Sequence, residues 1–475
     1  MTDLPMTIKD AAAALRAGSI TSVQLTEAMI ERANTLDPKL GVYIRRLDEA
    51  ALTDAARADA DFAAGIDLGP LQGIPLGVKD IIATDDAPTT AQSLVLDPRW
   101  GDQGDAPVVK RLRAAGAVIT GKTSTMEFAN GLPDPDKPFP VPHNPWNVDY
   151  WTGGSGSGTG AGIAAGLFYG GLGTDTGGSI RGPAAFCGIS GIKPTFGLVP
   201  KNGCTFNGFS LDHIGPMARS AWDCAAMLQV MAGYDPGDAC SANVAVPDYL
   251  VELAGSVGGL KLAVERDNHT RVDGVLPEVV HLFEAAGGLL ASAGAGITEV
   301  TLPNWTVIKS AHTLTSNVEK YVYHKVDMPS RWQDYGRNTR FSSAQGVLVD
   351  GADYVQAQRV RSYGVKAVLA LLEPYDALIV PANGKTAPKL EGLSFESQWG
   401  SNVRQTSFTG GWNFLGFPAI AIPMGFSDSG LPLSLQIIGK PFREAVVFRI
   451  ADAFQRLTDW HLRVPPIAKL EGAYA

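Results

Sequence analysis

Two serines set in glycine-rich runs are the residues of this 475-residue chain whose types and spacing point most directly to chemistry. Ser155 lies in the run GGSGSG (153–158), and Ser179 lies in the run GTDTGGSIR (173–181). Glycines beside a serine let the backbone turn where a Cβ would block it, and they expose amide N–H groups that can stabilise a developing negative charge. A flexible linker can have the same composition. Residues 161–172 between the runs are small and apolar, which predicts a buried helix against a sheet. A flexible linker would not contain a core segment, so the pattern favours a serine nucleophile for acyl transfer.

Lys79 is the candidate base for these serines. It lies in an apolar, strand-like segment (74–82), and a lysine that points into a core loses hydration, which lowers its pKa and leaves a neutral amine. A surface lysine with a packed aliphatic stem is equally compatible with the segment. No HExxH spacing predicts a metal site, and no GxSxG elbow surrounds either serine. No histidine is close in sequence to the serines; the seven are His143, His213, His269, His281, His312, His324 and His461.

Residues 116–123 (GAVITGKT) match the phosphate-binding P-loop pattern letter for letter. A P-loop follows a strand and opens a helix, whereas here a helical pattern precedes the first glycine and the residues between the glycines are apolar and strand-like. Backbone amides held in a sheet cannot bind phosphates. A nucleotide-binding module therefore remains only a minor alternative.

Composition and charge narrow the class of partner and the compartment. The chain has 39 basic and 48 acidic residues and a net charge of −9, which predicts a small-molecule substrate and neither a nucleic-acid nor a membrane partner. The N-terminus shows no secretory or membrane-spanning segment, so we expect a cytoplasmic protein. The cysteines are spaced too widely for a metal site and are expected to be reduced; they are Cys187, Cys204, Cys224 and Cys240.

Alternating helical and strand-like segments predict an α/β layered fold, which we expect to be a single domain over 1–475. Residues 1–65 are expected to be peripheral helices, and 129–151 a long loop of the kind that carries function. The aromatic, mostly helical section 302–365 forms either a wall or lid of the substrate pocket or ordinary packing. Strands are expected at 74–82, 117–121, 189–194, 197–200, 377–381, 419–425 and 433–439, with a helix at 106–115.

The run 153–197, with GTDTGGSIR at its centre, resembles the signature of the amidase signature family. The resemblance extends over nearly the whole chain, because further segments occur in the family's order: 73–80 (GIPLGVKD), 121–123, 210–216 (SLDHIGP), 413–418 and 435–439. The resemblance implies an α/β/α layered domain around a large mixed central sheet. It also implies a hydrolase that needs no cofactor.

The resemblance assigns roles to the residues of the two runs. Ser179 would be the nucleophile, Ser155, after a cis peptide bond, the relay serine, and Lys79 the base; the 24 residues between the serines agree with the family's spacing. The other expected roles are oxyanion N–H donors at Thr176, Gly177, Gly178 and Ser179, structural support by Asp175 and Arg181, and substrate contacts by Ala129, Asn130 and Trp151.

Two positions depart from the family's pattern. Gly156 stands where many members have a second serine after the relay serine. Thr406 stands where the A subunit of glutamyl-tRNA amidotransferase uses an acidic residue to hold the amine of glutamine, and a zwitterion is poorly recognised without that carboxylate. We therefore expect a stand-alone monomer or homodimer that cleaves C–N bonds of amides, anilides or carbamates, similar to aryl acylamidases and urethanases. The alternative is the glutaminase A subunit of the amidotransferase.

Overall fold

The computed structural model describes residues 4–394 and 406–470, and an eleven-stranded mixed sheet organises them. The strand order is β1-β3-β2-β6-β8-β7-β12-β13-β11-β9-β10, which confirms the predicted large mixed sheet. The strands are β1 (Tyr43–Arg46), β2 (Pro75–Lys79), β3 (Val118–Thr123), β6 (Gly170–Asp175), β7 (Ser190–Lys193), β8 (His213–Ala218), β9 (Lys261–Glu265), β10 (Gly296–Val300), β11 (Ala377–Pro381), β12 (Ala419–Phe426) and β13 (Pro432–Gly439), with a separate hairpin of β4 (His143–Asn144) and β5 (Asn147–Trp151).

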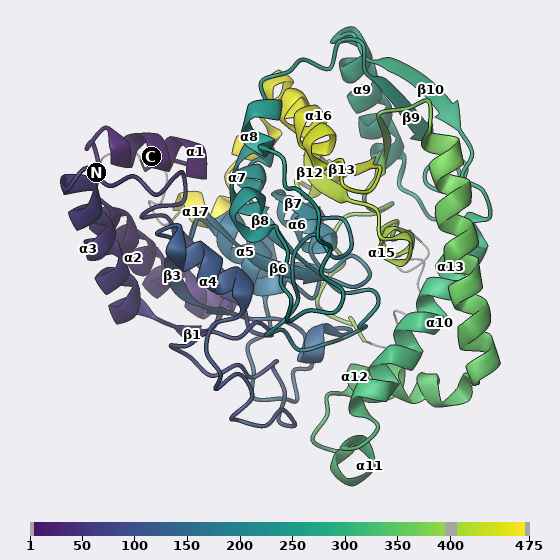
Figure 1. The fold of residues 1–475 in the computed structure, drawn as a ribbon, viewed down its shortest axis with the longest axis horizontal. Helices are drawn as coiled ribbons and strands as arrows, with labels where there is room; N and C mark the ends of the chain where they lie inside the picture. The colour runs from purple at the N-terminus through teal and green to yellow at the C-terminus, as the bar shows by residue number, and fades with distance from the viewer. Residues whose placement is uncertain (1–3, 395–405, 471–475) are drawn as a thin grey trace.

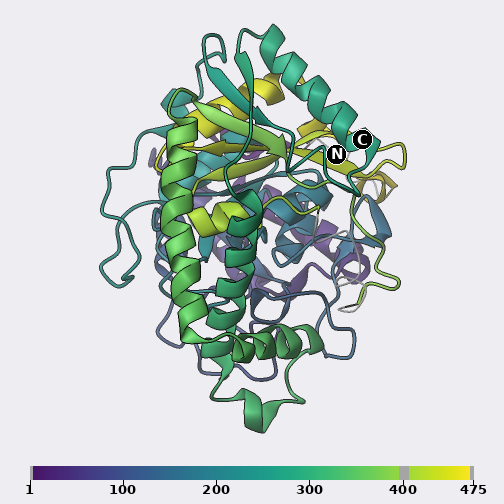
Figure 2. The same cartoon turned by 90° about the vertical axis from the view of Figure 1, so that its right-hand side faces the viewer.

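Helices cover both faces of this sheet (Figure 1). In chain order they are α1 (Ile8–Arg16), α2 (Ser22–Leu40), α3 (Asp48–Ala63), α4 (Pro107–Ala114), α5 (Ser157–Ala165), α6 (Arg181–Cys187), α7 (Ala221–Met231), α8 (Tyr249–Glu252), α9 (Pro277–Ser292), α10 (Trp305–His324), α11 (Met328–Arg331), α12 (Arg337–Ala344), α13 (Gly351–Leu372), α15 (Gly410–Leu415), α16 (Glu444–Leu457) and α17 (Pro466–Leu470), with short 3₁₀ turns at η1 (Glu127–Ala129), η2 (Gln345–Leu348) and η3 (Trp460–Leu462). Helices α10 and α13 lie side by side in both views (Figures 1 and 2).

The layers follow from the alternation of side chains along each strand. On β11, Ile379 packs into the core beneath α4, α7, α9 and α16, whereas its neighbours Leu378 and Val380 pack against α10, α13 and α15 on the other face. On β12, Ile420 faces the first core and Ala421 faces α5 and α6. Both faces are apolar because helices bury both.

The N-terminal helices have the predicted amphipathic pattern. Thr21 and Gln24 form a reciprocal capping box that fixes the start of α2. The Thr7 hydroxyl caps α1 by accepting from the backbone N–H of Asp10. Within the described part of the chain, none of the helices combines the length and the apolar character needed to span a bilayer.

Three sequence-based predictions of elements were wrong. The loop expected over 129–151 contains the hairpin of β4 and β5 at its C-terminal end. The helix expected over 161–172 is α5, which ends at Gly166 in a left-handed conformation (φ 74°), and the chain then forms β6. The segment 197–200 is a turn and not a strand, because Gly197 adopts a φ of 84°. At Gly166 and at Gly197 a glycine with positive φ ends the regular pattern.

Candidate active site

Lys79 ends strand β2 and is fully buried at 0% exposure. Its Nζ lies 2.7 Å from Ser155 Oγ and 2.8 Å from Thr174 Oγ1. Burial lowers the pKa of Lys79 from 10.5 to about 7, and the negative charges of Asp175 and Asp212 only partly oppose that effect. The structure therefore selects the buried position over the surface position that the sequence also allowed. Thr174 was missed, although it lies directly before Asp175 in the second run.

Ser155 is 1% exposed and follows a cis peptide bond from Gly154. The backbone N–H of Gly156 donates to the carbonyl oxygen of Ser179 at 2.9 Å, so the two glycine-rich runs are joined directly. Ser179 is half-buried and lines the same cavity as Ser155. Among the described residues the hydroxyl of Ser179 makes no hydrogen bond. The structure therefore does not itself show a path for a proton from Ser179 to Ser155.

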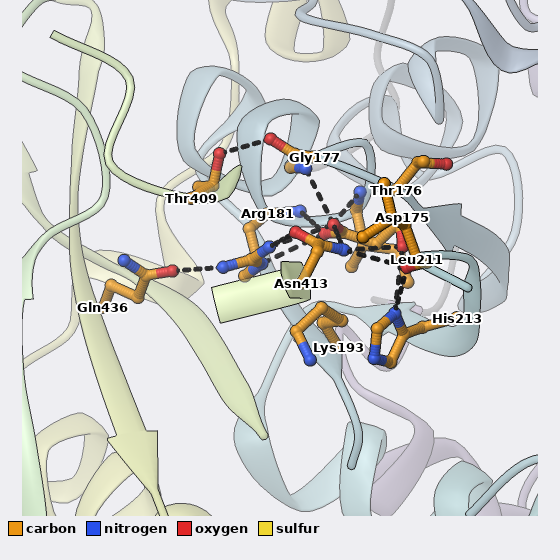
Figure 3. A network of polar contacts seen from close by, with 12 residues as sticks. Asp175, Thr176, Gly177, Arg181, Lys193, Leu211, His213, Thr409, Asn413 and Gln436 are labelled. Atoms are coloured by element: carbon orange, nitrogen blue, oxygen red, sulfur yellow. Dashed lines mark hydrogen bonds and ion pairs between the residues drawn. The ribbon is translucent and has the colours of Figure 1, made fainter. Parts of the chain in front are cut away.

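The carboxylate of Asp175 organises the second run (Figure 3). Its Oδ1 accepts from the backbone N–H of Gly178 at 2.7 Å, and its Oδ2 accepts from that of Ile180 at 3.1 Å. Arg181 binds both carboxylate oxygens, through Nη2 to Oδ1 at 2.9 Å and through Nε to Oδ2 at 3.0 Å, and both side chains are fully buried. Burial alone would raise the pKa of Asp175, but Arg181 outweighs it and holds the pKa below its usual range.

Two amides from the C-terminal half complete this network and were not assigned a role from the sequence. Asn413 Nδ2 donates to the carbonyl oxygen of Asp175 at 2.7 Å, and its Oδ1 accepts from Arg181 Nη2 at 2.6 Å. Gln436 on β13 accepts from Arg181 Nη1 at 2.6 Å. Their motifs had been noted in the sequence, but their distance of more than 200 residues from Arg181 gave no signal of contact.

The glycine loop 176–179 is held by two further side chains that the sequence did not reveal. Thr409 Oγ1 donates to the carbonyl oxygen of Gly177 at 2.6 Å, and His312 Nε2 lies 3.0 Å from that of Thr176. The N–H of Gly178 donates to Asp175, which conflicts with its expected role as an oxyanion donor. Within the described chain the N–H groups of Gly177 and Ser179 have no partner.

A cavity of about 330 Å³ opens beside Ser155 and Ser179, a volume typical of small-molecule sites. Helix α10, from the aromatic section 302–365, forms part of its wall. The three residues expected to contact substrate all line it; they are Ala129, Asn130 and Trp151. Asn130 Oδ1 also accepts from Lys320 Nζ at 3.2 Å, which fixes its amide against α10.

The P-loop-like segment lies elsewhere and has a structural role. Residues Val118–Thr123 are the fully buried strand β3, as the sequence context indicated. Lys122 Nζ donates to the carbonyl oxygen of Ile82 at 2.6 Å and to Thr89 Oγ1 at 2.7 Å. A lysine engaged in this way within the sheet is not available to a phosphate.

Comparisons with known proteins agree with this fold and site. The family model described as Amidase matches residues 24–448. A relative from Chloroflexus aggregans, named as the A subunit of glutamyl-tRNA(Gln) amidotransferase, is 37% identical over 99% of this chain and 100% of its own. The native peptide amidase of Stenotrophomonas maltophilia is 30% identical with a TM-score of 0.82, over 97% of this chain and 99% of its own. A third similar structure comes from work on a vestigial protein complex and the evolutionary origins of an s-triazine catabolic enzyme. It is 29% identical with a TM-score of 0.86, over 95% of this chain and 98% of its own.

The chain therefore belongs to the amidase (amidase signature) family, as the resemblance indicated. It is an enzyme that hydrolyses amide C–N bonds. The expectation of a monomer or homodimer with a small-molecule substrate as its only partner, and with no nucleic acid, is wrong. The relatives that overturn it carry in their name both a tRNA and the designation of one subunit among several. Net charge misled here, because a total of −9 does not describe individual surfaces.

Proposed function

We propose that Ser179 attacks the carbonyl carbon of a carboxamide and forms an acyl-enzyme, with Ser155 and Lys79 as the proton relay. The contact that carries this proposal is the 2.7 Å approach of Lys79 Nζ to Ser155 Oγ in a fully buried environment. A lysine with a pKa of about 7 is largely neutral just above neutral pH and can accept a proton from Ser155, which takes one from Ser179.

The glycine loop would stabilise the tetrahedral oxyanion. The N–H groups of Gly177 and Ser179 are the donors that the described structure leaves unused, and that of Thr176 completes the expected set without Gly178. The Asp175–Arg181 network would keep these donors rigid. The relay then returns a proton to the leaving nitrogen, and a water molecule, activated by the same relay, hydrolyses the ester to the carboxylic acid.

The named relatives support a narrower form of this function. They favour the release of ammonia from glutamine within an amidotransferase over the hydrolysis of anilides or carbamates. In that role the chain would act together with other subunits, with glutamyl-tRNA as the final acceptor. The bound glutamine would then contact the cavity residues Ala129, Asn130 and Trp151.

Thr406 supports a second candidate, the hydrolysis of amides that carry no ammonium group. Thr406 lines the cavity at the position where the resemblance places the acidic residue for glutamine's amine. Among the described residues that line the cavity, none is an aspartate or a glutamate. A substrate ammonium group would therefore lack a counterion within this part of the wall.

One steady-state experiment tests the shared proposal and separates the two candidates. Ammonia release is measured from glutamine, from the same amide without the α-amine (glutaramate), and from an anilide, by the wild type and by Ser179→Ala. We expect turnover of at least one carboxamide and none by Ser179→Ala. Turnover by Ser179→Ala at a rate near that of the wild type refutes the assigned nucleophile.

A further inference from the structure

The described residues that line the cavity carry an excess of positive charge. Helix α10 contributes Lys309 and Lys320, and the segment after β11 contributes Lys385. Lys309 and Lys385 are half-buried and form no ion pair with any described residue. Burial lowers the pKa of Lys309, and among the described residues no carboxylate opposes this effect. Two amines beside a small cavity, without a counterion in the described part of the chain, favour a ligand that supplies the negative charge.

Buried neutral donors point to the same kind of ligand. The indole Nε1 atoms of Trp151 and Trp305 and the amide Nδ2 of Asn383 are buried and have no hydrogen-bond partner among the described residues. All three side chains line the cavity, and the two tryptophans are only 7% and 2% exposed. A buried donor that lacks an acceptor is costly, so these groups are suited to an acceptor brought by the substrate.

We propose that the amide substrate carries a carboxylate beyond its scissile carbonyl, and that Lys309 and Lys385 determine this specificity. The substrate class is a monoamide of a dicarboxylic acid, with a short chain between the amide and the acid. This inference rests on the proposed function, because the carboxamide must reach Ser179 while the acid lies at the lysines. His312, which also lines the cavity, does not add charge at neutral pH, since burial lowers its pKa to about 4.

Binding to the Ser179→Ala variant tests the inference without requiring turnover. The probes are succinamate and glutaramate, each compared with its methyl ester by isothermal titration calorimetry. We expect each acid to bind at least about tenfold more tightly than its ester, as for a charged group that loses a partly buried partner. Lys309→Met and Lys385→Met should each reduce this ratio several-fold, and Lys385→Arg should retain most of it. The inference is overturned if each acid binds with the same affinity as its methyl ester. It is also overturned if the acid-to-ester affinity ratio is unchanged in both Lys309→Met and Lys385→Met.

Matched controls come from lysines outside the cavity. Lys325 directly follows α10, and Lys389 lies four residues after Lys385. Lys325 and Lys389 are exposed, and neither of these two lysines lines the cavity. Lys325→Met and Lys389→Met should leave the acid-to-ester ratio unchanged, and a loss equal to that of the cavity variants contradicts a local site.

Wild-type turnover then separates the two proposals. If Ser179→Ala prefers the acids but the wild type hydrolyses none of the amides, the anion site stands and the proposed reaction fails. If the wild type hydrolyses acid and ester amides with equal kcat/KM and the binding preference is absent, the reaction stands and the anion site fails.

Discussion

The ring of His312 on α10 holds the glycine loop through one atom: its Nε2 lies 3.0 Å from the carbonyl oxygen of Thr176. A carbonyl oxygen only accepts, so Nε2 carries the proton and donates. Burial lowers the pKa of His312 to about 4, which leaves the ring neutral over the working pH range. The same ring lies within about 4 Å of where a Cβ on Gly177 or Gly410 would stand, so loop and helix are closely packed here.

We expect His312 to position the loop rather than react. His312→Leu should lower kcat about tenfold or more with little change in KM, because it removes the donor that orients the Thr176–Gly177 peptide. His312→Gln, which can place an N–H donor near the same carbonyl, should recover part of the loss. Two outcomes contradict a positioning role. One is a pH profile in which His312→Leu loses an ionisation with a pKa near 4, and the other is a His312→Gln variant that is no more active than His312→Leu.

Removal of the relay groups should abolish turnover. We expect Ser179→Ala, Ser155→Ala and Lys79→Met each to lower kcat by about a thousandfold or more, because nucleophile and base act as one unit. Ser157→Ala is the matched control: Ser157 lies in the same run, but its hydroxyl donates to the carbonyl oxygen of Gly153 at 2.8 Å. It should keep most of the activity. Single-turnover measurements on an activated ester substrate check both groups of variants.

The pH dependence should report Lys79. Only the neutral amine accepts a proton, so kcat/KM should rise with pH through about 7 and level off above it. Lys79→Arg should be inactive at every pH, since a guanidinium stays protonated. A rate that is flat between pH 6 and 9 with a substrate that does not itself titrate would exclude lysine as the base.

Close packing around Gly156 accounts for its departure from the family's pattern. A Cβ at this position would lie 2.7 Å from the carbonyl oxygen of Ser179 and 3.3 Å from Met217 Sδ. The first contact is with backbone, so Gly156→Ser should displace the Ser179 peptide and reduce both activity and thermal stability. Gly287→Ala in α9, where no atom of the described residues lies within 4 Å of the new Cβ, should be neutral or stabilising. An active, equally stable Gly156→Ser variant would show that the loop can adjust.

The sequence predicted the residues of local motifs well, and it failed where contacts join distant segments. Lys79, Ser155 and Ser179 were singled out because a lysine in an apolar strand and serines between glycines carry their signal within a few neighbouring residues. Their catalytic roles came from the family resemblance and stay predictions. Strand β11 was predicted at its observed bounds. Sequence reasoning missed the roles of four residues, Asn413, Gln436, Thr409 and His312. These roles depend on the topology that brings α10, α15 and β13 to the glycine loop, and the spacing of residues along the chain does not predict that topology. Short strands such as β8 were missed because their burial on both faces removes the alternation of polar and apolar residues.

The buried ion pair should be essential for folding. Arg181 is fully buried and binds Asp175, Asn413 and Gln436 at once. Arg181→Met leaves the carboxylate of Asp175 buried without its counterion and should lower the free energy of unfolding by about 3–5 kcal/mol, as measured by urea titration. Arg181→Lys should recover little, because one ammonium cannot reproduce the planar set of donors. Arg99→Met, which breaks an exposed pair with Asp97, should leave the urea midpoint unchanged.

The buried base should also lower the free energy of unfolding at low pH, and this cost should disappear between pH 7 and about 10.5. In the folded chain the pKa of Lys79 is about 7, whereas an unfolded lysine keeps its proton up to about 10.5. Between these values the unfolded state binds more protons, so the free energy of unfolding of the wild type should rise with pH across the window. Lys79→Met removes this group, and its melting temperature relative to the wild type should therefore be highest near pH 6 and fall by pH 10. Differential scanning calorimetry of both proteins from pH 6 to 10 measures the difference. Parallel stability profiles would mean that the amine is solvated or remains charged in the folded enzyme, and that the relay from Lys79 through Ser155 lacks a neutral base.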